Sequence, residues 1–197
     1  MSKVNITRSG NEISVSSPFN PAFVRRAKYL GGKWNAETKV WTFDARDEED
    51  VRALCLDIYG IDGSPVKLVD VRVTYNYSEC SDRDAIYFCG REIARAWGRD
   101  SGAKLGNGVK LVKGKVHSGG SVKNWATIIE KGTVLVIRDV PEPIALRECG
   151  KNDLRLVEIL PSTPVVDIAA LKVERDKLVA RIAEIDSILS EQAATAA

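Results

Sequence analysis

The stretch FNPAFVRRAKYLGGKWNAETKVWTF, residues 19–43, decides how the first part of the chain folds. Asn20 is a residue type that caps helices, and Pro21 occupies the favoured first helical position, so a helix is predicted over PAFVRRAKYL. The pair Gly31-Gly32 ends that helix. The segments KWN and KVWTF then flank Ala36-Glu37-Thr38 and predict a β-hairpin.

The sequence on either side of this stretch completes a small module. Polar and apolar residues alternate on both sides of Ser9-Gly10-Asn11, which predicts a first hairpin within VNITRSGNEISVSS. The acidic stretch that Asp44 opens places carboxylates in a first helical turn, where the helix dipole favours them, and Gly60 ends this helix. We therefore predict a ββαββα module over residues 1–62, followed by a turn-rich boundary, GIDGSP, at 60–65.

Two further parts follow this module. Residues 63–160 are rich in β-branched and aromatic residues with glycine-rich, basic connections, and they predict a mostly antiparallel β domain. Residues 161–197 carry apolar residues at alternating steps of three and four, which predicts a long coiled-coil-like helix with a frayed tail, in an α+β protein. The alternative is an amphipathic helix that docks on its own domain. The residues expected to mediate homo-oligomerisation are Leu171, Leu178, Ile182, Ile185 and Leu189.

The composition argues against several classes of protein. The start of the chain lacks an apolar core of signal-peptide length, and no run reaches the ~18 apolar residues of a membrane span, so we expect a cytoplasmic protein with no membrane partner. The four cysteines form no C-x-x-C pair and His117 is the one histidine, so no metal site and no cofactor are expected. Asp82 and Asp84 are close in sequence, but they favour a polar loop over metal-dependent chemistry. No nucleophile elbow or kinase motif is present, and we expect no enzymatic activity.

Positive charge is concentrated in two regions of a chain whose formal net charge is only +2. Residues 1–43 carry seven basic and two acidic residues, whereas residues 44–62 carry two basic and seven acidic ones. Residues 66–123 carry eleven basic and six acidic residues. A site for a polyanion must therefore come from local clustering, and each basic region could supply one.

Residues 19–43 resemble the HARP domain, the small module found beside the motor of annealing helicases. The resemblance rests on Phe19-Asn20, the basic helix, Lys33, Trp34-Asn35, Thr38-Lys39, Trp41 and Phe43. It extends weakly through the acidic helix to about residue 60, and no Walker A motif or helicase motor is present in the rest of the chain. The resemblance implies a module that recognises single-stranded or forked DNA. It does not imply ATP-driven annealing.

The same residues support DNA binding by their chemistry. Lysine and arginine neutralise phosphates, and a tryptophan face can stack on an unpaired base of any identity. Trp41 and Phe43 share strand parity and are expected in the core, whereas core and contact roles stay open for Trp34. The candidate DNA-binding residues are Arg25, Arg26, Lys28, Lys33, Trp34 and Lys39.

The basic, glycine-rich middle region offers a second hypothesis. Glycines let backbone amides approach an anion, so this region could bind a nucleotide or another small phosphorylated ligand; ordinary turn glycines and surface charges are the alternative. The candidate residues are Arg91, Arg95, Arg99, Lys104, Lys115, Lys123 and Trp125. The first hypothesis is thus a non-enzymatic, homo-oligomeric DNA-binding accessory protein encoded by a phage or plasmid. The second is a protein that sequesters a nucleotide, for example in counter-defence.

Overall fold

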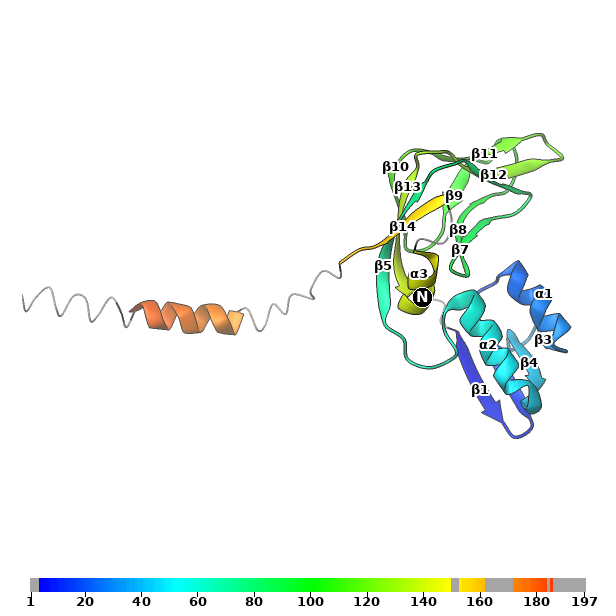
Figure 1. Cartoon of the computed structure of the whole chain (residues 1–197), viewed down its shortest axis with the longest axis horizontal. Coiled ribbons are helices and arrows are strands. Elements are labelled where there is room, and N and C mark those ends of the chain that lie inside the picture. Colours follow the sequence, from blue (N-terminus) through cyan, green and yellow to red (C-terminus); the bar gives the residue numbers. More distant parts are fainter. Residues whose placement is uncertain (1–3, 150–152, 162–171, 184, 186–197) are drawn as a thin grey trace, which may run out of the picture. The chain divides into compact units, whose positions relative to one another are not determined.

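The structure is a computed structural model that describes residues 4–149, 153–161, 172–183 and 185. The chain divides into two compact units, Met1–Pro161 and Ser162–Ala197. In the described part of the first unit, 14 strands form four sheets in which every paired strand is antiparallel, together with four short helices (Figure 1). Across the described residues, no helix has both the length and the apolar character that crossing a membrane requires.

The predicted α+β class with a long C-terminal helix is wrong. Antiparallel sheets dominate the fold, and they join some strands to the next strand along the chain and others to strands far away in sequence. The long helix is not seen, since the helical residues described there are 172–183 and 185 and their side chains are all exposed. The alternating steps of three and four between apolar residues predict which residues share a helix face. A helix that buries none of its side chains, however, gains no stability from packing. Leu171 and Leu189 lie outside the described residues.

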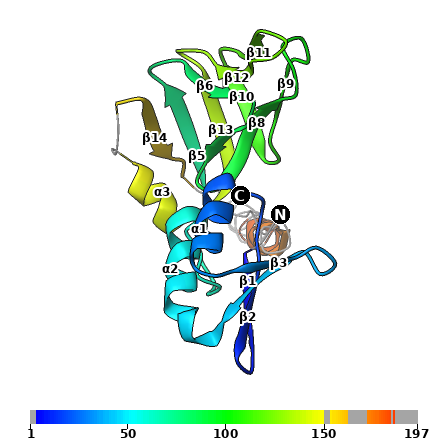
Figure 2. The same ribbon diagram turned by 90° about the vertical axis from the view of Figure 1, so that its right-hand side faces the viewer.

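The first sheet has the strand order β1-β2-β4-β3. Helices α1 and α2 pack together beside it (Figure 2). Its core side chains alternate along the strands, so that Ile13 lies opposite Phe43 and Val15 lies opposite Trp41, all of them buried. The elements are β1 (Asn5–Ser9), β2 (Glu12–Ser16), α1 (Pro21–Tyr29), β3 (Lys33–Asn35), β4 (Val40–Asp44), the 3-10 helix η1 (Ala45–Asp47) and α2 (Glu48–Tyr59).

Three further sheets surround a second core that includes Val71, Ile93, Leu135 and Ile137. The sheet of order β10-β13-β5-β14 contains β5 (Leu68–Tyr75), β10 (Val109–Lys113), β13 (Val134–Pro141) and β14 (Arg155–Ile159). The sheet of order β11-β12-β6 contains β6 (Glu79–Asp82), β11 (Val116–Gly120) and β12 (Trp125–Ile129). The sheet of order β7-β8-β9 contains β7 (Ile86–Phe88), β8 (Arg91–Ala96) and β9 (Ala103–Leu105), and helix α3 (Glu142–Glu148) follows β13.

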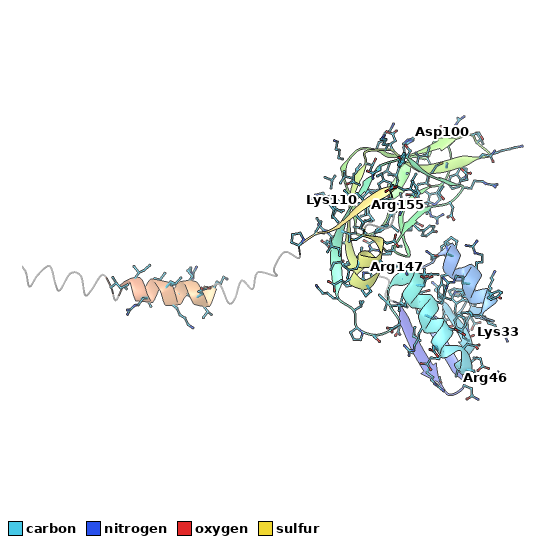
Figure 3. All side chains as sticks on the ribbon, in the orientation of Figure 1. Lys33, Arg46, Asp100, Lys110, Arg147 and Arg155 are labelled. Atoms are coloured by element: carbon cyan, nitrogen blue, oxygen red, sulfur yellow. The ribbon has the colours of Figure 1, made fainter. Side chains whose placement is uncertain are left out.

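Helices α1, α2 and α3 lie side by side where the first sixty residues meet the β-rich part (Figures 1 and 2). Asp57 on α2 binds Arg26 of α1 and Arg147 of α3, and its Oδ1 lies 2.8 Å from the Arg147 Nη1. Figure 3 labels Arg147. The Asn20 amide nitrogen donates a hydrogen bond of 3.3 Å to the carbonyl of Gly90. A Cβ on Gly90 would lie 2.5 Å from the carbonyl oxygen of Ile58, so only glycine permits this close approach.

Candidate nucleic-acid interface

Helix α1 presents a basic and aromatic face to solvent. The Asn20 carboxamide oxygen accepts a hydrogen bond of 3.0 Å from the Phe23 amide, which caps the helix, and Pro21 begins it. Burial of Phe23 and Ala27 turns the opposite side outward. Arg25, Lys28 and Tyr29 lie three and four residues apart on that exposed side, and Tyr29 is 92% exposed.

The β3–β4 hairpin carries further exposed basic and aromatic residues. All three residues of β3 are exposed because it is an edge strand. The loop is fixed by the Asn35 carboxamide oxygen, which accepts hydrogen bonds from the amides of Glu37 at 2.9 Å and Thr38 at 3.1 Å. Lys39 completes the loop with a φ of 56°. The hairpin therefore holds Lys33, Trp34 and Lys39 on an ordered turn.

Trp34 rests on an aromatic chain that leads into the core. Its ring centroid lies 5.6 Å from that of Trp41 with a tilt of 50°, and Trp41 in turn meets Phe23 edge-on at 6.3 Å. Trp41 is 6% exposed, whereas Trp34 is 51% exposed. Trp34 thus packs against Trp41 and still exposes a large apolar surface to solvent, which is the arrangement that stacking on an unpaired base requires.

The cations of α1 and of the β3–β4 hairpin differ in whether they already have a partner. The side chains of Arg25, Lys28, Lys33 and Lys39 are exposed, and none of them makes an ion pair or hydrogen bond with another described residue. Arg26 is instead held by Asp57, and the hydrogen bond from Arg26 is the main cause that lowers the pKa of this carboxyl group. We call Arg25, Lys28, Tyr29, Lys33, Trp34 and Lys39 the hairpin face.

The arginines predicted in the middle region are engaged by neighbouring groups. The Arg95 guanidinium lies 2.7 Å from a Glu92 carboxylate oxygen, 3.3 Å from one of Asp84 and 3.0 Å from the Tyr87 hydroxyl. Arg99 pairs with Asp100 at 2.7 Å. Arg91 donates hydrogen bonds to main-chain carbonyls. The three arginines therefore do not form one row of free positive charge.

The other predicted ligand-binding residues are dispersed over several elements. The Lys104 ammonium on β9 lies 5.7 Å from the ring centroid of Trp97, a cation–π contact. Lys115 pairs with Glu130 at 3.6 Å, and Lys123 is exposed in the loop between β11 and β12. Trp125 begins β12, where it is half-buried opposite Gly120.

Two of the four cysteine thiols are buried and protonated. Burial raises the pKa of Cys55 and of Cys89 to about 12, which keeps both thiols protonated at neutral pH. The Asp84 carboxylate forms an ion pair with Arg95. The four cysteines are free thiols. No cluster of three or more histidine, cysteine, aspartate or glutamate side chains suited to a metal ion occurs in the described part of the chain.

Tyr29 was not among the residues predicted from sequence, although it is the most exposed aromatic side chain of the hairpin face. A signal for it was present, because it lies four residues after Arg25 and one after Lys28 on a helix whose buried positions are Phe23 and Ala27.

No family model, curated protein or solved structure matches the chain. The likeness of residues 19–43 to HARP modules stays a prediction.

Proposed function

We propose that this protein binds single-stranded or forked DNA through the hairpin face, without catalysing a reaction. The observation that carries the proposal is that α1 and the β3–β4 hairpin carry four exposed cations with no ion pair among the described residues, and that the hairpin also carries Trp34, a half-exposed tryptophan packed on Trp41. The cations would neutralise DNA phosphates and release the counterions condensed on them, while an exposed base would stack on Trp34. Duplex DNA hides its base faces, so the stacking contribution favours unpaired strands.

Several cations of the β-rich part are already engaged by partners. On the β-rich part, Arg95 and Arg99 already bind carboxylates and Lys104 lies over an aromatic ring. A phosphate would have to compete with these partners. Lys33 and its neighbours on the hairpin face have no such competitor among the described residues, so a polyanion gains the whole interaction there.

Self-association stays a prediction, as does the role of a phage or plasmid accessory protein. Leu178, Ile182 and Ile185 are exposed on the described helical residues 172–183 and 185, and a second copy would remove them from water. Two linked hairpin faces would hold one DNA strand more tightly through effective concentration. Light scattering on the full chain and on a variant with serine at these three positions measures this directly: a larger particle that the variant loses is expected.

The test of DNA binding compares two tryptophans of similar exposure. Trp34 is 51% exposed on β3, and Trp97 is 56% exposed after β8, so Trp97→Ala is a matched control for Trp34→Ala. Fluorescence anisotropy with a labelled 15-nucleotide single strand would measure the dissociation constant of each full-length protein. Loss of one stacked base costs ~1–3 kcal/mol, so Trp34→Ala should weaken binding about 5- to 150-fold and Trp97→Ala less than twofold. Equal losses in both variants, or none in Trp34→Ala, would refute the proposed face.

A further inference from the structure

A groove of about 1160 Å³ lies away from the hairpin face, between the first sixty residues and the β-rich part. Its wall includes Phe19 and Tyr59 from the former and Leu68, Arg91, Asn107 and Arg138 from the latter. Pockets for small molecules typically measure about 300–1,000 Å³, so this groove has room for a ligand of nucleotide size. Of the residues predicted from sequence to bind a phosphorylated ligand, Arg91 alone lines it.

The position of Arg91 is set by a tight turn. Cys89 and Gly90 join β7 to β8 with φ values of 48° and 73°, the left-handed pair typical of a two-residue hairpin turn. Arg91 follows as the first residue of β8, opposite Phe88. The Gly90 carbonyl receives the Asn20 side chain, which fixes the turn against the start of α1.

Two further backbone features converge on the Arg91 guanidinium. A bulge in β13 between Ile137 and Val140 turns the carbonyls of Arg138 and Asp139 toward it, and the Asp139 carbonyl lies 3.2 Å from Nη1. The Asn107 carbonyl accepts a hydrogen bond of 2.6 Å from Nη2. Asp139 adopts a φ of 55°, which non-glycine residues rarely do, and such strained positions cluster at binding sites.

The guanidinium so held is not directly paired with a carboxylate. Its hydrogen-bond acceptors are main-chain carbonyl oxygens, and burial is the leading cause that lowers the pKa of Arg91, which reflects a poorly solvated charge. The carboxylates of the groove are Glu92, which binds Arg95, and Asp139, whose charge acts on Arg91 from nearby. Arg138 is exposed, and its side chain makes no ion pair or hydrogen bond within the described residues. The guanidinium groups of Arg91 and Arg138 are therefore the positive charges in the groove that an anion would contact.

An apolar surface lies in the same groove. Phe19 is 65% exposed just before the cap of α1, and Leu68 is 42% exposed at the start of β5. Pro18, Pro65 and Pro141 add rigid apolar wall. An exposed aromatic ring and aliphatic groups beside two guanidinium groups suit a ligand with a flat ring at one end and a negative charge at the other.

We propose that this groove binds a nucleotide, with the base against Phe19 and the apolar wall and the phosphate at Arg91 and Arg138. The guanidinium of Arg91 has two N–H groups beyond the three hydrogen bonds described, and Arg138 has all five. The phosphate would thereby receive charge-assisted hydrogen bonds from arginines on two different strands, β8 and β13. None of the residues of the hairpin face lines the groove, so the two sites can be tested with separate variants.

Isothermal titration calorimetry on the full-length protein tests this site with the four ribonucleoside triphosphates, AMP, adenosine and inorganic phosphate as probes. The variants are Phe19→Ala and Arg138→Gln, because both side chains are exposed and neither supports the core. Lys110→Gln, an exposed change on β10 outside the groove, is the matched control. We expect at least one nucleotide to bind, each groove variant to weaken it at least tenfold, and the control to leave it within twofold. Adenosine and phosphate alone should bind more weakly than the nucleotide.

The outcomes separate this site from the hairpin face. No heat with any nucleotide, or equal binding by the wild type and both groove variants, would overturn the proposal. If the groove variants weaken binding of the 15-nucleotide strand while no nucleotide binds, the groove belongs to the path of the DNA and the nucleotide proposal also fails. Nucleotide binding that survives Trp34→Ala and is lost in Arg138→Gln supports the site whatever the result for DNA.

Discussion

Replacing Lys33 and Lys39 together with glutamine should halve the salt dependence of DNA binding. Four cations of the hairpin face have no ion pair in the described part of the chain, namely Arg25, Lys28, Lys33 and Lys39. Each phosphate neutralised on a single strand contributes ~0.7 to the slope of log affinity against log salt, which gives about 2.8 for all four. Raising the salt from about 50 to 200 mM should then weaken the wild type about 50-fold and the double variant about 7-fold, with a slope near 1.4.

The assay is fluorescence anisotropy of a labelled single strand with full-length protein at four or more salt concentrations. The control is Lys110→Gln with Lys113→Gln, two exposed lysines of β10 that make no ion pair with another described residue. Lys33 and Lys110 lie on opposite sides of the first unit (Figure 3). The reasoning fails if the control pair lowers the slope as much as the hairpin pair, or if the hairpin pair leaves it near 2.8.

Three further predictions concern stability and reactivity. Gly90→Ala should lower the free energy of unfolding by at least ~1–3 kcal/mol, because the residue has a φ of 73° and its new Cβ would lie 2.5 Å from a backbone oxygen. The control Gly98→Ala, whose Cβ would meet no atom within 4 Å, should change this free energy by less than ~0.5 kcal/mol in the same denaturant titrations. Asp57→Asn should lower the free energy of unfolding by about 1 kcal/mol at pH 7. Because the pKa of Asp57 is lowered, the wild type keeps this stability at pH values above the ordinary pKa of 3.8 and loses it as the pH falls further. The variant should show no such acid loss from this position. Cys55 and Cys89, whose pKa is raised to about 12, should resist alkylation at pH 8 until denaturant is added, which mass spectrometry would follow; rapid labelling of the folded protein would contradict their burial.

Local patterns in the sequence predicted several features of the first sixty residues. Gly10 and Asn11 form the turn between β1 and β2, with Ser9 as the last residue of β1, and Asn20 caps α1 as its side-chain chemistry suggests. Trp41 and Phe43 are buried, as their shared strand parity predicts, and the open question about Trp34 resolves to a half-exposed ring. These features depend on residues within a few positions of one another, which is the range over which propensity and spacing act.

Features that depend on distant partners were not predictable in this way. Arg26 meets Asp57 on another helix, and Arg95 on β8 meets Asp84 in the loop between β6 and β7, so neither charge could be judged free or engaged from spacing alone. The groove was missed because Phe19 and Arg138 are far apart in sequence. The α+β class and the long C-terminal helix were wrong, since periodicity does not weigh local strand pairing against helix formation and does not supply a surface for a helix to pack on.

The double attachment of Asp57 has a consequence for dividing this protein into pieces. A fragment that stops at the turn-rich segment 60–65 would keep the hairpin face but lose Arg147, and it would leave Asp57 with one of its two arginines. It would also uncover the end of α2, where Gly90 now approaches Ile58 within the distance that only glycine allows. A recombination event or an engineered fusion that moved the first sixty residues to another protein would therefore need a new surface to receive α2. Transplanting the hairpin face is best done together with α3 and the strand that carries it.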